Sequence, residues 1–243
     1  MRKKSIILII FFSVFLDIFA YINLSPSTLD KNIGVGVYQE FTLYNETQIP
    51  FRYKITPIAF SGRTGVADMS KWVEVYPKVV TVHPNGESKF KVYIKAPKDS
   101  VTGDYGVFLN IKQMSAPNVK TSQADSISSA MIIMVDVNLG VYGYIGDKTP
   151  KLSFPVDPTI YKKEGKTYLK MKIKNETNRL VRMEIKVEGK KGYYYPIGDT
   201  RAFKMETLSF DNEIKDLGDI MPRNIIITDV ESKRIIKKLN LIK

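Results

Sequence analysis

Residues 88–96 read SKFKVYIKA, and this stretch decides the fold. Phe90, Val92 and Ile94 alternate with lysines and a tyrosine, so one side of the segment is apolar and the other is polar. A period of two places successive side chains on opposite faces, which predicts a half-buried β-strand rather than a helix. The segment therefore predicts a sheet with one face in a core and the other in water.

Segments of the same kind recur along the chain, separated by turn residues such as Pro84-Asn85-Gly86. No stretch shows a sustained helical period with capping residues at its ends. Short strands separated by turns at intervals of about 8–12 residues predict a sandwich or barrel. The expected strands are 40–45, 51–57, 72–76, 88–96, 105–112 and 131–144, then 151–156, 167–174, 181–188, 193–197, 224–229 and 234–242, the last two as a hairpin.

The chain divides into two series of strands, separated by the Gly- and Pro-containing residues 146–150. Each series contains a strand that ends in Asn-Glu-Thr, at Asn45 and at Asn175, followed by a short loop and another strand. Asparagine suits such a strand end because its side chain can bond nearby backbone groups. We predict an all-β protein of two immunoglobulin-like β-sandwich domains in tandem, at residues 21–146 and 151–243, joined by a linker at 147–150.

The N-terminus has the order of a secretory signal peptide. Three basic residues at positions 2–4 precede an apolar run, and a small residue, Ala20, stands at the expected cleavage point. The run is shorter than the ~20 residues that a membrane span needs. We expect residues 1–20 to be a signal peptide and the released chain to have no stable membrane insertion. An uncleaved N-terminal anchor is the alternative.

The composition excludes several classes of function. The chain has no cysteine, so it carries no disulfide, thiolate nucleophile or cysteine-bound zinc. His83 is the only histidine, which rules out a histidine-based triad and a multi-histidine metal site. The net charge of +12 is spread along the chain without a nucleic-acid-binding motif. We expect no enzyme, metal, cofactor or nucleic-acid partner, with two convergent acids in a cleft as the catalytic arrangement left open.

The first half of the long strand at 131–144 is apolar on both faces. If Ile133, Val135 and Val137 face the core, then Ile132 and Met134 face the other way. Such a strand is either covered on both faces or presents apolar surface to a partner. The serine-, glutamine- and asparagine-rich residues 114–129 precede it and form a long expected loop.

The order of these motifs resembles one family. WVEVYP at 72–77, VHPNGESKFKV at 82–92, GDYGVFLNI at 103–111, a polar loop and a long strand resemble the N-terminal domain of the PapD-like periplasmic pilus chaperones. The resemblance spans nearly all of the chain after the signal, and it implies a divergent member of this chaperone family. It implies a periplasmic protein that lends its long strand to a pilin-like or surface-fibre subunit, and an outer-membrane usher as a second partner.

The resemblance also implies the residues that bind the partner. The donor residues would be Met131, Ile133, Val135, Val137 and Leu139, or Ile132 and Met134 if the register is shifted by one. The family anchors the subunit's terminal carboxylate with an arginine on the first strand and a lysine on the long strand. Here the first segment offers only Lys31 and the long strand has no lysine. The alternative function is an exported immunoglobulin-like cell-surface binding or scaffold protein without chaperone activity.

Overall fold

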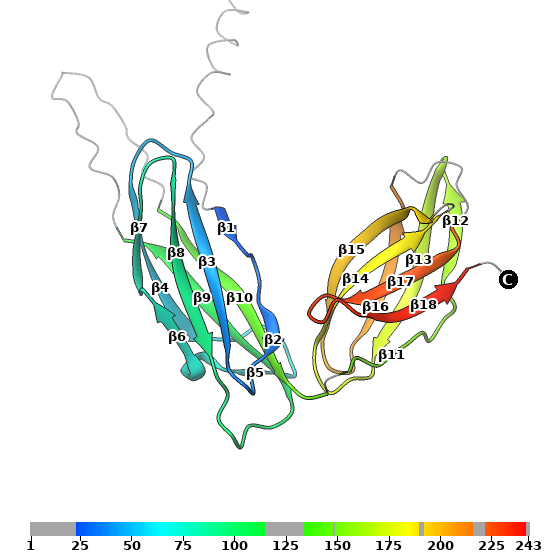
Figure 1. Ribbon diagram of the computed structural model, residues 1–243, viewed down its shortest axis with the longest axis horizontal. Helices are drawn as coiled ribbons and strands as arrows, with labels where there is room; N and C mark the ends of the chain where they lie inside the picture. Colours follow the sequence, from blue (N-terminus) through cyan, green and yellow to red (C-terminus); the bar gives the residue numbers. More distant parts are fainter. Residues whose placement is uncertain (1–22, 115–133, 148, 190–191, 216–221, 242–243) are drawn as a thin grey trace, which may run out of the picture.

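The computed structural model describes residues 23–114, 134–147, 149–189, 192–215 and 222–241. In these residues every element is a β-strand except η1, a single 3-10 turn at Ser70–Trp72. The strands form four sheets, which Figure 1 shows as two separate two-layered bodies. The predicted all-β class with two immunoglobulin-like sandwiches is confirmed. The predicted signal peptide lies outside the described residues, and no helix within them could cross a membrane.

The first sandwich consists of sheets A and B. Sheet A has the order β1-β3-β8-β6, and sheet B has the order β2-β10-β9-β4-β7 with β5 beside β9. Their strands are β1 (Asn23–Ser25), β2 (Asp30–Asn32), β3 (Val37–Asn45), β4 (Phe51–Ala59), β5 (Val66–Asp68), β6 (Val73–Tyr76), β7 (Val79–Val82), β8 (Gly86–Ile94), β9 (Gly103–Gln113) and β10 (Asp136–Ile145). As the sequence predicts, Phe90, Val92 and Ile94 are fully buried between the sheets.

The second sandwich consists of sheets C and D. In sheet C, β13 pairs with β11 and β12 along one side and with β16 along the other, and sheet D has the order β15-β14-β17-β18. The strands are β11 (Leu152–Ser153), β12 (Thr159–Lys163), β13 (Lys166–Asn175), β14 (Val181–Glu188), β15 (Tyr194–Ala202), β16 (Thr207–Glu213), β17 (Asn224–Asp229) and β18 (Ile235–Asn240). The predicted hairpin of 224–229 and 234–242 is present as β17 and β18. Because β10 ends at Ile145 and β11 begins at Leu152, the predicted linker lies between them, while the domain limits stay a prediction.

The same arrangement of hydrogen bonds around a buried asparagine occurs once in each sandwich. Asn45, at the end of β3, donates from Nδ2 to the carbonyls of Ile49, Val82 and His83. Asn175, at the end of β13, donates in the same way to the carbonyls of Arg179, Ala202 and Phe203, at 2.8, 3.1 and 2.9 Å. In each copy Oδ1 accepts from the backbone N–H of the threonine two residues later. Each asparagine therefore ties its loop to the end of a strand in the facing sheet.

Polar contacts join the first sandwich to the second. The Asp30 carboxylate, on β2, accepts two hydrogen bonds of 2.6 Å from the guanidinium of Arg201, on β15. The Arg201 guanidinium also lies over the Tyr142 ring, 4.5 Å from its centroid. The Asp104 carboxylate accepts from the backbone N–H groups of Leu180 and Lys204, and burial raises the pKa of Asp104. These contacts place β2 and the end of β10 against the second sandwich.

Candidate partner-binding edge

β10 is paired with other strands to different extents on its two sides. On one side it pairs with β9 along its whole length, from Asp136 opposite Lys112 to Ile145 opposite Gly103. On the other side, β2 pairs with it only at residues 142–144. Among the described residues no strand lies beside residues 136–141 on that side. We call this stretch the open edge of β10.

The path of the N-terminal strand explains the open edge. β1 pairs with β3 in sheet A, where Asn23 to Ser25 face Tyr44 to Thr42. The chain then crosses to sheet B, where β2 pairs in parallel with the far end of β10. Figure 1 shows β1 and β2 at opposite ends of the sandwich edge. Because one segment is divided between two sheets, it covers only the last part of β10.

The backbone bonds show which polar groups face the open edge. The carbonyl of Val135 accepts from the N–H of Gln113 at 2.8 Å, on the β9 side. The N–H of Tyr142 donates to the carbonyl of Leu29 at 2.9 Å, on the β2 side. In an antiparallel pair these directions alternate along the strand. Asp136, Asn138 and Gly140 therefore present their backbone N–H and C=O groups to the open edge.

The side chains alternate on the same strand. Val141 is fully buried, and Val135 and Leu139 are half-buried against the first core. Val137 points to the same side by alternation, yet 43% of it is exposed, because no described strand lies next to it. Met134 precedes β10 on the opposite parity and is 45% exposed. The open edge thus combines backbone groups that no described strand pairs with and an accessible apolar side chain.

A polar network on the outer face holds β10 in register. Asn110 Nδ2 donates to the carboxylate of Asp136 at 2.6 Å and to the side-chain oxygen of Asn138 at 2.9 Å. Lys112 Nζ lies 3.4 Å from the Asp136 carboxylate. The Asn110 hydrogen bond lowers the pKa of Asp136, so this carboxyl stays ionised and bonded at neutral pH. A slip of one residue would break these bonds and turn Val137 to the outer face.

The structure places only some of the predicted donor residues. Met131, Ile132 and Ile133 lie outside the described residues. Lys31 lies on β2 opposite Gly143, and its Nζ donates to Gln39 Oε1 at 3.3 Å. Within the described residues Lys31 forms no ion pair, so its charge is not neutralised there.

Sequence reasoning missed the residues that define this edge through their backbone. Asp136, Asn138 and Gly140 have polar or absent side chains, and only the strand parity could have identified them. It also missed Asp30, because the family resemblance implies a base in the first segment, whereas Asp30 is an acid that pairs with arginine from the second sandwich. No short-range signal links Asp30 to Arg201, which lies 171 residues away.

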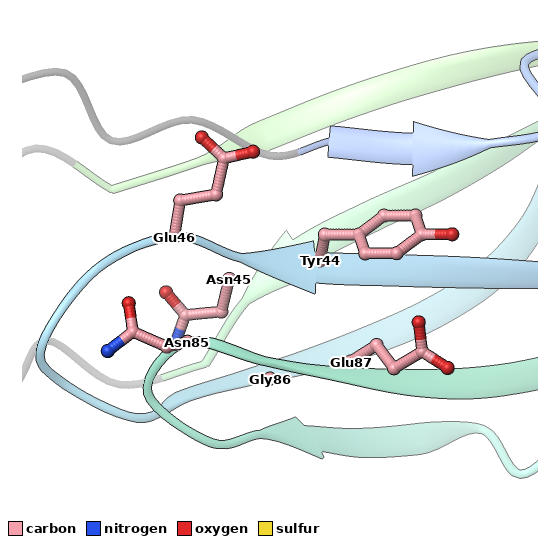
Figure 2. Close-up of a pocket in the computed structure, with 6 residues that line it drawn as sticks. All are labelled: Tyr44, Asn45, Glu46, Asn85, Gly86 and Glu87. Atoms are coloured by element: carbon pink, nitrogen blue, oxygen red, sulfur yellow. The ribbon is translucent and has the colours of Figure 1, made fainter.

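A separate depression lies where β3 and β8 meet their turns. Its volume is about 300 Å³, and Figure 2 shows Glu46 and Glu87 on its wall with their carboxylates pointing away from each other. The Asn45 amide points into the turn, where its hydrogen bonds are already made. This depression therefore holds no converging pair of acids. Among the described residues there is also no group of three potential metal ligands.

Comparisons with known proteins support no assignment from sequence. No family model matches the chain, and no curated protein matches it. Solved structures do match in fold. A structure of the Salmonella enterica SafA pilin with the SafB chaperone has a TM-score of 0.47 and 13% identity, covering 93% of this chain and 97% of that one.

Two further structures extend over both sandwiches. The Escherichia coli chaperone DraB has a TM-score of 0.46 and 10% identity, covering 90% of this chain and 95% of that one. The Acinetobacter baumannii CsuC–CsuE complex of a chaperone with a tip adhesion subunit has a TM-score of 0.43 and 12% identity, covering 90% and 97%. The likeness is one of fold. Several of the matching structures are bacterial chaperones, each at low identity to this chain.

Proposed function

We propose that this protein binds a β-sheet subunit by lending it the open edge of β10. The added strand of the subunit would take its main-chain hydrogen bonds from Asp136, Asn138 and Gly140. The apolar side chains of Val135, Val137 and Leu139 would fill the space that a missing strand leaves in the subunit's core. The protein would act as a chaperone without catalysis.

The single observation that carries this proposal is the combination found at residues 136–141. Edge strands in stable proteins are normally covered, shortened or protected by charge, because an uncovered edge pairs with other chains. Here no described strand pairs with the edge, and Val137 beside it is accessible. A strand added at this position would bury Val137 and complete the ladder from Asp136 to Tyr142.

The partner class rests on the resemblance of the sequence to pilus chaperones. We propose pilin-like or surface-fibre subunits as partners, with an outer-membrane usher as the acceptor of the complex and the periplasm as the compartment. Met131, Ile132, Ile133 and Met134 would lengthen the contact on the N-terminal side of β10. Lys31, which forms no ion pair within the part of the chain that the structure describes, would contact the end of the subunit near residues 142–144.

Replacing Val137 by aspartate is expected to weaken subunit binding at least about tenfold, because a charge would be buried without a partner in the new interface. The tagged chain serves as bait in a periplasmic extract of the host, and captured subunits are identified and quantified by mass spectrometry. Val35→Asp is the matched control, since Val35 is 83% exposed and lies on another segment. Equal capture by both variants would contradict the proposal, and capture of proteins other than β-sandwich subunits would favour a cell-surface binding protein.

Backbone amide exchange tests the edge directly. In the free chain, the amides of Asp136, Asn138 and Gly140 should exchange rapidly, while those of Val137 and Leu139, bonded to β9, should be protected. Adding the purified subunit should protect the first set by about tenfold or more. Gly140→Pro should prevent this and leave the fold intact, because it removes an N–H that faces the open edge and leaves the Asn110 hydrogen bonds in place. Protection confined to other strands would place the subunit elsewhere.

A further inference from the structure

A second depression, with a volume of about 420 Å³, lies at one end of sheet A. It is formed where η1 leads into β6 and where β8 runs into the following turn. The residues around it are Lys71, Trp72, Glu74, Tyr93, Lys95, Ala96, Pro97 and Lys98. Its volume is within the range of about 300–1,000 Å³ that is usual for small-molecule sites. None of these residues belongs to β10 or β2, so the depression is separate from the open edge.

Two aromatic side chains of this depression are held in place. The Trp72 ring packs on Tyr105, with centroids 4.9 Å apart, and the Tyr93 ring packs on Tyr38, with centroids 4.4 Å apart. Gly36 makes room for Tyr93, because a Cβ at that position would lie 2.8 Å from the Tyr93 hydroxyl. Gly36 also has a φ of 85°, which other residues rarely adopt. Ring packing thus restrains each of these two half-buried side chains.

The rim of the depression is basic. The side chains of Lys71, Lys95 and Lys98 are exposed, and within the described residues none of them forms an ion pair. The charge of Lys71 also acts on the nearby Asp68 carboxylate and helps to lower its pKa, so Lys95 and Lys98 carry most of the uncompensated charge. Among the described residues, Glu74 is the only acid that lines the depression, against these three lysines. Elsewhere on the same sheet the lysine charge is compensated, as where Lys89 pairs with Glu40 at 3.1 Å. An excess of positive charge around a concave surface attracts anionic ligands.

We propose that this depression binds a negatively charged sugar unit. The flat rings of Trp72 and Tyr93 offer surfaces for the apolar C–H faces of a pyranose ring. The ammonium groups of Lys71, Lys95 and Lys98 would bind its acidic group. A bare anion would leave the aromatic surface unused, and a neutral sugar would leave the lysines without partners. A ligand with both properties uses both parts of the depression.

Trp72 gives a direct readout, because it is the only tryptophan in the chain. The full chain is titrated with trigalacturonate while tryptophan fluorescence is followed. Maltotriose tests a sugar without charge, and triglutamate tests the same type of charge without a sugar ring. We expect a saturable fluorescence change with trigalacturonate, and binding of both control ligands about tenfold weaker or less.

A charge reversal tests the lysines. The double variant Lys95→Glu/Lys98→Glu is expected to weaken trigalacturonate binding about tenfold, because two exposed attractions are replaced by repulsions. The double variant Lys170→Glu/Lys172→Glu makes the same change of net charge on exposed positions of β13 and should leave binding unchanged. Thermal unfolding checks that both variants fold.

Four outcomes would overturn the proposal. The first is no change in tryptophan fluorescence with trigalacturonate. The second is equal binding of triglutamate or maltotriose, which would show that the sugar ring or the charge is not recognised. The third is unchanged binding after the reversal at Lys95 and Lys98. The fourth is an equal loss in the β13 variant, which would show attraction to the overall charge of the protein.

Discussion

Replacing Arg201 by alanine is expected to lower the free energy of unfolding by about 3 kcal/mol. The Asp30 carboxylate is almost completely buried, with its side chain 1% exposed, and Arg201 gives it two hydrogen bonds of 2.6 Å. Without Arg201, the nearest remaining cation is Arg182, whose guanidinium lies 3.7 Å away and is bonded to Asp199. A buried charge that loses its main partner is costly because water does not replace it.

The measurement is urea-induced unfolding of the full chain, followed by circular dichroism. Arg52→Ala is the matched control, since Arg52 is exposed on β4, and it should change stability by less than about 0.5 kcal/mol. A double-mutant cycle with Asp30→Asn separates the ion pair from the packing of Arg201 on Tyr142. Additive effects of Asp30→Asn and Arg201→Ala would show that the two side chains do not interact, contrary to this prediction.

The second large effect is expected at Asn175. Its side chain is fully buried and bonds three backbone carbonyls, so Asn175→Ala should cost about 3 kcal/mol, because buried carbonyls would lose their donor. Asn175→Asp should cost more, since it places a negative oxygen against the same carbonyls. Asn45→Ala should have a similar but smaller effect, because part of its loop is exposed to water.

Asn178→Ala is the control for this series, since Asn178 is exposed in the same loop. It should change the free energy of unfolding by less than about 0.5 kcal/mol. Thermal and urea unfolding both report the comparison. If Asn175→Ala were no more destabilising than Asn178→Ala, the carbonyls of Ala202 and Phe203 would not depend on this amide.

Strands with strong alternation, such as β14, or with a continuous apolar run, such as β17, could be predicted from sequence. β14 and β17 have the predicted limits, 181–188 and 224–229, because each buried face is filled by aliphatic side chains. Several predicted strands had wrong limits, among them two in the second sandwich. The strand expected at 151–156 is reduced to Leu152–Ser153, and that at 193–197 continues to Ala202. Both lie at sheet edges, where pairing with one neighbour leaves a weak pattern.

Other strands had too little apolar content to be found. β12 and β16 were not predicted, because β12 reads TIYKK and β16 reads TLSFDNE, with few buried side chains. They form because the backbone of β13 provides hydrogen-bonding partners on both of its sides, to β12 on one and to β16 on the other. The open edge of β10 was beyond sequence reasoning for a related reason. It depends on where β2 begins, at Asp30 opposite Tyr142, which is set by the crossing of the chain from sheet A to sheet B.

The two buried asparagines also bear on how the protein can be produced. Asn45-Glu46-Thr47 and Asn175-Glu176-Thr177 both match the acceptor sequence for N-linked glycans. A eukaryotic secretory host attaches the glycan to the amide nitrogen of the emerging chain, before folding protects it. That nitrogen is the donor to three carbonyls in each sandwich, and a glycan has no room there. Production in a host that lacks this modification preserves both amides, whereas modification at either one is incompatible with the native loop.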